Sequence, residues 1–477
     1  MAGPAGMAAP RGSTFRPSAA LVEHVAKVRS ALGSSKLNVA VVGGGRSGRA
    51  AAQLLRAKGQ SPSILDDRAS DPADELALEK LERSRIDAAD LVVLSPGVPR
   101  EHPALRGALD RTVGELELAS WFVTAPLLGV TGTNGKSTTT ALAGHLLATS
   151  KLRAFVGGNL GRPLCELAAS GEAVDVAVVE LSSYQLEALV TARFEVACWL
   201  NLTPDHTDRY ADVETYARAK ERILELRSPT GIGVMNAEDE TCVRAAERAG
   251  GRIRWFSTRN DDERTNAAGT HFFAGSLHTR SNGDVFEIEL RNDRLPGRHN
   301  ASNAAAALEC ARVFGASIDG LREGISSFLG LPHRIELVGT IGGARYLNDS
   351  KATNIDSVMT AVNAVDGPKV LIVGGRDKGA PWDPLVELSS SRDVKHVLAI
   401  GEATPIAVRA FSGRIPIEEK GDLGNALMRA RELAGPGWSV LLSPACSSFD
   451  QFKNYEERGD TMRRLVLEME GNDGRGR

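Results

Sequence analysis

The sequence predicts an α/β fold built on mostly parallel sheets, and three observations lead to that prediction. Short apolar runs that end in Gly, Ser or Asp alternate with Ala-rich amphipathic stretches, the pattern of strand–helix–strand units on a parallel sheet. The chain has 477 residues, enough for about three domains at roughly 150 residues each. Hydrophobic residues make up 42% and charged residues 25% of the chain, a globular composition that excludes disordered and fibrous proteins.

Charge and cysteine content exclude several classes of partner. Lys and Arg total 57 against 60 Asp and Glu, for a net charge of -3, so we expect no general attraction to nucleic acid or to membrane surfaces. No apolar run approaches the roughly 18 residues of a membrane span, so we expect no membrane insertion. The five cysteines are scattered and lack a C-x-x-C spacing, which favours a reducing, cytoplasmic location.

The alternation divides into three blocks with a tail at each end. We expect flexible tails over 1–18 and 471–477, and domains over 19–125, 126–329 and 330–470. The first and third blocks read as Rossmann-like, and the second as a phosphate-loop domain with a mostly parallel sheet.

Within each block the apolar runs and turn residues give the expected elements. The first block contains, in order, a helix over 19–32, a strand over 37–42, a glycine-rich turn over 43–48, a helix to about residue 58, a strand ending at Asp66, and a strand over 91–94 before the turn 95–97. The second contains a strand leading to Gly132, a helix over 139–149, strands over 174–180 and 196–202, a helix over 212–226 with Asp212 as N-cap, and a polar surface excursion over 250–292. The third contains strands over 369–373, 394–400 and 438–442.

The strongest local signal is T-G-T-N-G-K-S-T at 131–138, between a strand and a helix. Small residues let backbone N–H groups close on phosphate oxygens, Lys136 reaches the terminal phosphates, and Ser137 is placed to coordinate Mg²⁺. The usual pattern has a glycine where this chain has Val130. The alternative is a plain glycine turn joining strand to helix.

Two neighbouring strands carry polar residues to the same sheet edge, beyond their carboxyl ends. One strand ends at Glu180, and the other is followed by His206. Ser137, Glu180 and bound phosphates form a plausible Mg²⁺ set. Taken separately, Glu180 reads as a solvated carboxylate and His206 as a capping or packing histidine.

The turn 43–48 with Asp66 at the next strand end allows a dinucleotide such as NAD. Asp67 and Arg68 follow, so this edge could accept ribose hydroxyls and a phosphate. The alternative is that the glycines serve only tight strand–helix packing.

Taken together, these residues resemble the Mur ligases of peptidoglycan synthesis over nearly everything after the N-terminal tail. The segments that carry the resemblance are T-G-T-N-G-K-S-T at 131–138, G-G-N-L-G at 157–161, E-L-S-S-Y-Q-L-E at 180–187, N-L-T-P-D-H-T-D-R-Y at 201–210, L-P-H-R-I-E at 331–336, N-D-S-K-A-T-N at 348–354 and S-P-A-C-S-S-F-D-Q-F-K-N-Y-E-E-R-G-D at 443–460.

The resemblance implies three domains: an N-terminal one for a UDP sugar, a central ATPase and a Rossmann-like C-terminal one for the amino acid. The likeness is closest to the branch that adds D-glutamate to UDP-N-acetylmuramoyl-L-alanine. ATP would phosphorylate the substrate carboxylate, and the amine of D-glutamate would attack the acyl phosphate, giving an amide, ADP and phosphate. The D-N-P-R signature of the diaminopimelate-adding relatives is absent from the sequence.

The resemblance also implies roles for individual residues at the ATP and metal sites. ATP contacts fall on Gly132, Thr133, Asn134, Gly135, Lys136, Ser137, Thr138, His299, Asn300, Asn303, Arg334 and Asp349. Catalytic roles fall on Lys136, Glu180, His206, Lys220 and Lys351. Two Mg²⁺ ions would be held by Ser137, Glu180, His206 and Lys220, the last as a carbamylated lysine; without the resemblance, Lys220 reads as a solvated helix lysine.

The remaining implied contacts concern the two other substrates. The sugar nucleotide would meet Arg46, Ser47, Asp66, Asp67, Arg68, Gly97, Asn159 and Ser182. D-Glutamate would meet Thr353, Lys378, Ser448, Phe449 and Tyr455. The family's usual aliphatic-Thr pair in the first turn is Arg46-Ser47 here, so this chain departs from the pattern at the uracil contacts.

Other readings stay open at this point. A phosphate-loop kinase or simple NTPase explains 131–138 but leaves the third block without a task. A dinucleotide-binding oxidoreductase or sensor built on 43–66 ignores the phosphate loop. A sister Mur ligase or a folylpolyglutamate-synthase-like ligase would use another amino acid. The protein is expected to be a monomer.

Overall fold

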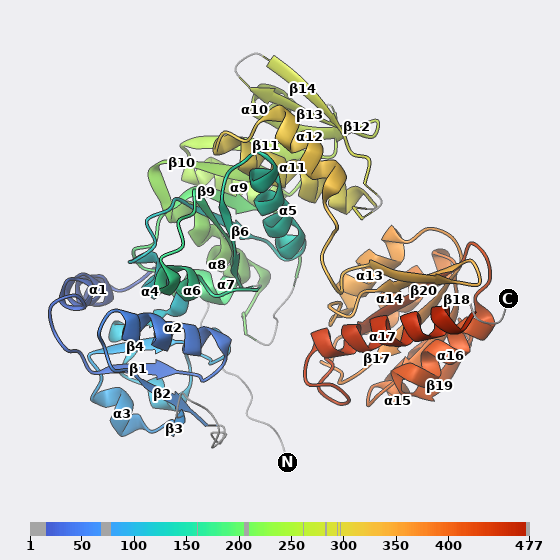
Figure 1. Cartoon of the computed structure of the whole chain (residues 1–477), viewed down its shortest axis with the longest axis horizontal. Coiled ribbons are helices and arrows are strands. Elements are labelled where there is room, and N and C mark those ends of the chain that lie inside the picture. The colour runs from blue at the N-terminus through green and yellow to red at the C-terminus, as the bar shows by residue number, and fades with distance from the viewer. Residues whose placement is uncertain are drawn as a thin grey trace. The chain divides into compact units, whose positions relative to one another are not determined.

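The computed structural model describes residues 16–67, 78–159, 161–204, 209–260, 262–281, 284–292, 294–295 and 297–473. The described residues form three β-sheets and two compact units. The first unit comprises the described part of Met1–Arg291 with Ala301–Phe328, and the second comprises that of Asn292–Asn300 with Leu329–Arg477. The predicted α/β class is confirmed (Figure 1).

The first sheet is wholly parallel, with strand order β3-β2-β1-β4-β5. Its strands are β1 (Val39–Val42), β2 (Ser63–Asp66), β3 (Leu78–Lys80), β4 (Leu91–Leu94) and β5 (Thr112–Gly114). The helices around it are α1 (Ala19–Ala31), α2 (Arg46–Ala57), α3 (Arg83–Asp87) and α4 (Glu115–Ser120), with 3-10 turns η1 (Pro103–Leu105) and η2 (Leu109–Arg111). Strands β1 and β4 are buried at every position, as in parallel sheets covered on both faces.

The central sheet belongs to the same unit and has the order β14-β13-β12-β11-β10-β9-β6-β8-β7. Its strands are β6 (Leu127–Thr131), β7 (Ala154–Gly158), β8 (Val176–Glu180), β9 (Phe194–Trp199), β10 (Arg227–Asn236), β11 (Arg252–Ser257), β12 (Gly269–Phe273), β13 (Ser276–Ser281) and β14 (Asp284–Glu289). The helices are α5 (Lys136–Thr149), α6 (Leu164–Ser170), α7 (Ser183–Glu187), α8 (Val213–Glu225), α9 (Glu240–Ala249), α10 (Glu263–Ala268), α11 (Gly297–Val313) and α12 (Ile318–Ser327).

The third sheet lies in the second unit, with the order β15-β16-β20-β17-β18-β19 and one antiparallel pair, β15 with β16. Its strands are β15 (Glu336–Ile341), β16 (Ala344–Asn348), β17 (Lys369–Gly374), β18 (Val394–Ile400), β19 (Ile417–Gly421) and β20 (Ser439–Ala445). The helices are α13 (Ile355–Ala364), α14 (Asp383–Ser391), α15 (Thr404–Phe411), α16 (Leu423–Leu433) and α17 (Tyr455–Asp473). Met462, Val466 and Met469 of α17 are buried in the core on one face of this sheet.

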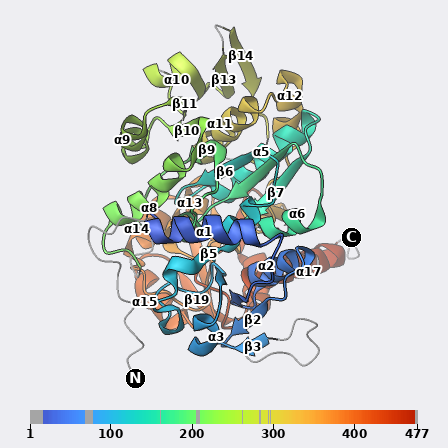
Figure 2. The same ribbon diagram turned by 90° about the vertical axis from the view of Figure 1, so that its left-hand side faces the viewer.

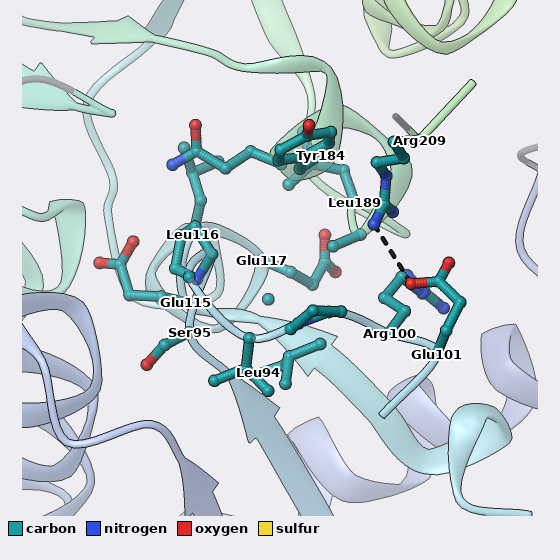
Figure 3. A pocket seen from close by; sticks show the side chains of 17 residues that line it. Leu94, Ser95, Arg100, Glu101, Glu115, Leu116, Glu117, Tyr184, Leu189 and Arg209 are labelled. Carbon is teal, nitrogen blue, oxygen red and sulfur yellow. Dashed lines mark hydrogen bonds and ion pairs between the residues drawn. The ribbon is translucent and has the colours of Figure 1, made fainter. Parts of the chain in front are cut away.

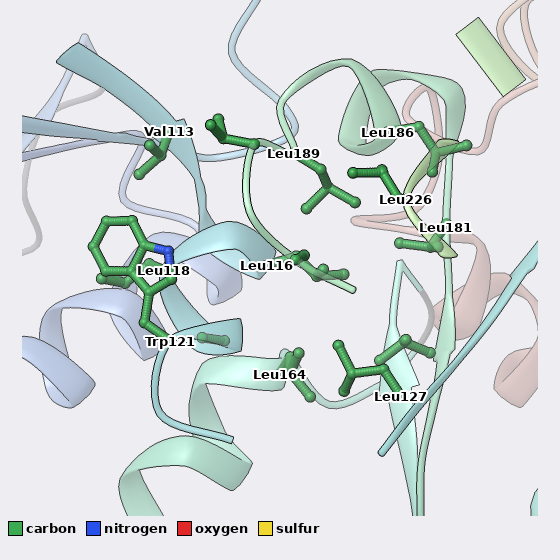
Figure 4. Packing of buried hydrophobic residues seen from close by; sticks show 14 of the residues in the cluster. Val113, Leu116, Leu118, Trp121, Leu127, Leu164, Leu181, Leu186, Leu189 and Leu226 are labelled. Carbon is green, nitrogen blue, oxygen red and sulfur yellow. The ribbon is translucent and has the colours of Figure 1, made fainter. Parts of the chain in front are cut away.

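A continuous apolar core joins the first and central sheets. Leu116, Leu118 and Trp121 of the segment around α4 belong to the same buried cluster as Leu127 of β6 and Leu164 of α6 (Figure 4). Burying apolar surface from both sheets in one cluster stabilises their association. This is the physical reason that the two sheets form one unit.

Several details of the chain differ from the sequence prediction. Residues 250–292 do not form a separate surface excursion, because β11 pairs with β10 and the next strands extend the central sheet. Arg46–Gly48 form the first turn of α2 rather than a loop. Residues 471–473 continue α17 instead of starting a tail.

Ser18, placed in the predicted N-terminal tail, caps α1, which Figure 2 shows along its full length in dark blue. Residues 1–15 and 474–477 of the two predicted tails lie outside the described residues. The five cysteines are all buried and all free. Among the described residues, no helix combines the length and apolar character needed to cross a membrane.

Candidate active site

The predicted phosphate loop connects the buried strand β6 to helix α5, as its sequence indicates. Asn201, just after β9, holds the loop in place: its side-chain oxygen accepts the backbone N–H groups of Thr133 at 3.1 Å and Asn134 at 2.9 Å. Its amide donates in turn to the Asn134 carbonyl at 3.1 Å. The prediction did not single out Asn201, although it lies in the N-L-T-P-D-H segment.

Gly135 ends the loop in a left-handed conformation, with φ at 83°, at the N-cap of α5. A Cβ atom here would collide with the side-chain oxygen of Asn303. Asn303, one of the predicted nucleotide residues, thus packs directly on the loop. Ser137 and Thr138 are buried in the first turn of α5, whose N-terminal N–H groups favour an anion.

Two lysines meet at the loop. The Lys136 amine donates to the carbonyls of Gly132 at 2.9 Å and Thr133 at 2.8 Å. The Lys220 amine, from α8, donates to the same Gly132 carbonyl at 2.8 Å. Lys220 is 1% exposed and lies 4.6 Å above the ring of Tyr216. Lys220 is therefore not the solvated helix lysine that its sequence context alone suggests.

Glu180 is the buried carboxylate of this edge. The register pairs Glu180 of β8 with Val130 of β6 and Gly158 of β7, which places it beside the loop. One carboxylate oxygen accepts the side-chain amide of Asn159 at 2.8 Å, while the other, Oε2, is buried with no hydrogen-bond partner among the described residues. A buried anionic oxygen without a donor fits a cation ligand.

The structure supports only part of the proposed metal set directly. Ser137 and Glu180 supply oxygen ligands of the kind that Mg²⁺ prefers. His206 lies outside the described residues. The described part of the chain contains no group of three His, Cys, Asp or Glu side chains placed to hold a metal ion.

Glu187 anchors an aromatic row that ends at Lys220, and the sequence prediction missed it. It accepts the hydroxyl of Tyr210 and pairs with Arg209 at 2.8 Å. The Tyr210 ring packs on Tyr216 at 5.1 Å between centroids, and Tyr216 in turn lies beneath the Lys220 amine. Glu187, Arg209 and Tyr210 belong to the segments 180–187 and 201–210 that carry the family resemblance, but their contacts depend on the fold.

A cavity of about 490 Å³, here called the α2 cavity, gathers most of the predicted sugar-nucleotide residues. Residues from the first sheet and from the central sheet line it: Gly43, Gly45, Arg46, Ser47, Asp66, Ser95, Pro96, Gly97, Val98, Gly158, Asn159 and Gln185. No side chain caps the N-terminus of α2, so its first N–H groups remain for an anionic ligand.

The predicted residues around this cavity have distinct surroundings. The Asp66 carboxylate accepts the Gly44 backbone N–H at 2.6 Å, and Asp67 lies 3.4 Å from His102. Arg46 is exposed and pairs with Glu166 at 3.5 Å. Ser182 caps α7 through a capping box with Gln185 and does not line the cavity.

Arg68 lies outside the described residues. It carries no structural support for a sugar-nucleotide contact here.

In the second unit, His299, Arg334 and Asp349 form an electrostatic cluster. Burial raises the pKa of Asp349 to about 7, against the opposing effects of the Ser443 hydrogen bond and of Arg334. Burial and then Arg334 lower the pKa of His299 to about 4. The residues flanking Arg334, His333 and Ile335, both have positive φ values, a strain that folded proteins often hold at functional sites.

The other predicted nucleotide residues of this unit are Asn300 and Lys351. Asn300 is buried, and the Lys351 amine lies 5.5 Å above the ring of Tyr455. Lys351 is thereby close to one of the predicted D-glutamate residues.

The predicted D-glutamate residues form smaller groups. The Lys378 amine donates to the Thr353 hydroxyl at 3.1 Å. Ser448 is buried, whereas Phe449 is 62% exposed.

Arg458 is a buried arginine that the sequence prediction did not single out. It donates to the hydroxyl and carbonyl of Ser350 at 2.9 Å and to the Cys446 carbonyl at 3.2 Å. Burial lowers the pKa of Arg458 to about 10. Arg458 lies in α17 and thereby links Cys446, just after β20, to Ser350, just after β16. The segment after β16 also carries Lys351 and Thr353.

Three family descriptions match successive parts of the chain. "Mur ligase MurD-like, N-terminal domain" matches residues 37–115, "Mur ligase middle domain" matches 130–311, and "Mur ligase, glutamate ligase domain" matches 333–446.

Curated relatives match over nearly the full length. The UDP-N-acetylmuramoylalanine–D-glutamate ligase of Anaeromyxobacter dehalogenans is 44% identical over 456 residues, covering 90% of this chain and 97% of the relative. The ligase of the same name from Myxococcus xanthus is 43% identical over 453 residues, covering 91% and 99%.

Solved structures show the same fold at lower identity. The MurF ligase of Thermotoga maritima in complex with ADP has a TM-score of 0.60 at 17% identity and covers 91% of this chain and 95% of its own. A pseudomurein peptide ligase type C from Methanothermus fervidus has a TM-score of 0.58 at 17% identity, covering 91% and 100%.

Proposed function

The chain belongs to the Mur ligase family, and on that premise we propose how its own residues carry out the ATP-dependent addition of D-glutamate to UDP-N-acetylmuramoyl-L-alanine, a step in peptidoglycan synthesis. A carboxylate oxygen of the sugar nucleotide attacks the γ-phosphorus of ATP and ADP leaves. The D-glutamate amine then attacks the acyl carbon, losing a proton, and phosphate leaves as the amide forms.

The observation that carries the proposal is the meeting of the phosphate loop, Glu180 and Lys220 at one buried edge. The loop backbone and the N-terminus of α5 bind the phosphates of ATP, and Lys136 leaves its two loop carbonyls to pair with the γ-phosphate. Fixed positive groups that face the developing charge are the largest contribution most enzymes make to such a step.

Ser137 and Glu180 would hold a first Mg²⁺, and Oε2 of Glu180, which accepts no hydrogen bond from the described residues, would be the carboxylate ligand. His206 and Lys220 would hold a second Mg²⁺, with the Lys220 amine carbamylated by CO₂ with loss of a proton. Bound Mg²⁺ offsets negative charge on the phosphoryl oxygens. Burial of the Lys220 amine against Tyr216 supports this assignment, because a carbamate needs a site shielded from solvent.

The α2 cavity takes the sugar nucleotide. Backbone N–H groups at the start of α2, with Arg46 and Ser47, face its diphosphate, while Asn159 and Ser182 extend the path toward Glu180. Asp66 contributes by fixing the Gly44 backbone. Asp67, Arg68 and Gly97 are the remaining proposed contacts to the sugar nucleotide.

The second unit supplies the remaining groups. His299, Asn300, Arg334, Asp349 and Lys351 serve ATP, together with Asn303 of the first unit. Thr353 and Lys378 take one carboxylate of D-glutamate, and Ser448, Phe449 and Tyr455 lie toward the other. The hydrogen bond between Lys378 and Thr353 supports their joint role.

The domains follow as 19–125 for the sugar nucleotide, 126–329 for ATP and 330–470 for the amino acid. The working enzyme is a monomer, which sedimentation at assay concentrations tests.

The decisive experiment is phosphate release from ATP with Mg²⁺ and UDP-N-acetylmuramoyl-L-alanine, with product masses recorded. D-Glutamate, L-glutamate, L-lysine, diaminopimelate and D-alanyl-D-alanine are supplied in turn. Turnover with D-glutamate alone and one new amide is expected. Turnover with another amino acid would assign a sister reaction, and phosphate release that ignores the amino acid would refute the ligase.

A further inference from the structure

A second cavity lies in the first unit, between the loop Gly97–Glu101, the start of α4 and helix α7 (Figure 3). Its volume is about 400 Å³, within the usual range of small-molecule sites. We call it the α4–α7 cavity. It shares Gln185 and the segment Ser95–Val98 with the α2 cavity, but Arg46 and Asp66 line only the latter.

The walls of the α4–α7 cavity are mostly apolar, formed by Leu94, Val98, Leu116, Ala188 and Leu189. Such walls fit a compact hydrocarbon or aromatic body. A sugar or a phosphate alone would leave its polar groups unsatisfied against them.

Three acidic side chains also line the cavity, and each already has partners; Glu101 pairs with Arg209 at 3.2 Å. Glu117 is fully buried and accepts hydrogen bonds from Trp121, from Thr191 and from the backbone of residues 190–192. Glu115 accepts the Cys165 N–H at 2.7 Å, and burial raises the pKa of Glu115 to about 7. A cationic ligand therefore finds little to pair with.

Arg100, unlike these acidic side chains, has a charge that no partner in the described structure pairs with. Within the described part of the chain it makes one hydrogen bond, to the Glu187 carbonyl at 3.3 Å, and no carboxylate lies within 4 Å of it. Burial lowers its pKa, the sign of a desolvated charge. The two carboxylates that act on Arg100, Glu101 and Glu187, are already paired with Arg209 at 3.2 and 2.8 Å, and Figure 3 shows the pair with Glu101.

We propose that the α4–α7 cavity, which adjoins the α2 cavity and shares one wall with it, is a further binding site for a small amphipathic anion: an apolar body carrying one carboxylate. The apolar walls take the body, and the Arg100 guanidinium takes the carboxylate through N–H donors that the protein leaves unused. Guanidinium and carboxylate match in planar geometry, and pairing them removes the cost of a half-buried cation.

The test uses 2-naphthoate as the probe and 2-naphthamide, its neutral counterpart of the same shape, on the full-length protein by ligand-observed NMR titration. Wild type should bind the acid about tenfold or more tightly than the amide, the value of a charged hydrogen bond. Arg100→Gln should remove that preference by weakening the acid alone. Arg100→Lys should keep part of it, because the charge remains.

Arg106→Gln is the matched control, an exposed arginine of the same sheet domain that lines neither cavity. It should bind the acid as wild type does. Equal binding of acid and amide to wild type, an unchanged preference in Arg100→Gln, or competitive displacement of the acid by UDP would each overturn the proposal. Because the titration does not measure ligase turnover, its result is independent of whether the proposed reaction is correct.

Discussion

The amines of Lys136 and Lys220 donate to one acceptor, the carbonyl oxygen of Gly132, at 2.9 and 2.8 Å. Two cations on one carbonyl repel each other. The arrangement is relieved if the Lys220 amine becomes an anionic carbamate and Lys136 turns to phosphate. Through the shared carbonyl, the proposed carbamylation of Lys220 and the proposed phosphate binding by Lys136 depend on each other.

Replacing Lys220 with Arg keeps the positive charge but removes the amine that reacts with CO₂. Activity should fall by about 100-fold or more, the scale for losing one electrostatic group. Phosphate release measures this, and ¹³C NMR with labelled bicarbonate should show a carbamate signal in wild type only. Lys27→Ala, at an exposed position of α1, is the control. A fully active Lys220→Arg enzyme would rule out the carbamate.

Replacing Glu187 with Gln should weaken the aromatic row beneath Lys220. The lost charged hydrogen bonds should lower the free energy of unfolding by about 1.5–3 kcal/mol, measured in urea. Glu468→Gln, which removes the exposed partner of Arg464, should cost less than about 1 kcal/mol. A Glu187 variant as stable as the control, with unchanged turnover, would show that the row does not position Lys220.

The buried carboxyl of Asp349 gives a pH prediction. Its folded pKa of about 7 lies above the ordinary value of 3.8, so the folded state holds a proton that the unfolded state releases. This contribution to stability is present at low pH and is lost as the pH rises through about 7.

The variant Asp349→Asn lacks this proton. Between pH 5 and pH 7 the stability advantage of wild type over the variant should therefore shrink, by about 2 kcal/mol. Urea unfolding of both proteins at the two pH values measures it. A difference that stays constant or grows would place the Asp349 pKa near or below its ordinary value.

Gly135 and Gly171 form a matched pair, because both have positive φ but only Gly135 faces a neighbour. Alanine at either position carries a left-handed cost of about 1–2 kcal/mol. Gly135→Ala must also displace Asn303, so its KM for ATP should rise roughly 10-fold, about 1.4 kcal/mol. Gly171→Ala should leave that KM unchanged. Equal ATP KM values in the two variants would remove Asn303 and Gly135 from the nucleotide site.

The local chemistry of the chain was predictable where it depends on neighbours in sequence. The apolar run before Gly132, the phosphate loop and the Asp212 N-cap all appear where the residues indicate. Their signals are short-range, because strand propensity, glycine turns and caps act over a few residues.

Contacts that depend on strand order could not be predicted from residues that are neighbours in sequence. Glu187 meets Tyr210 across 23 residues, and Arg458 meets Ser350 across 108. Nothing in the neighbouring sequence distinguishes Glu187 from an exposed glutamate, or Arg458 from an exposed arginine on a helix. Residues 252–289 form short strands, and β12, β13 and β14 pair antiparallel as hairpins, but β11 and β12 continue the parallel central sheet, so the predicted surface excursion is wrong.

The five buried cysteines allow partial unfolding of the protein to be detected by their reactivity. Cys165, Cys198, Cys242 and Cys310 lie in the first unit and Cys446 in the second, and alkylating reagents react with exposed thiolates. A tag on Cys446 alone would record opening of the second unit, and tags on the other four would record opening of the first. Peptide mass mapping can therefore assign a substrate's protective effect to the unit that binds it, with no engineered label.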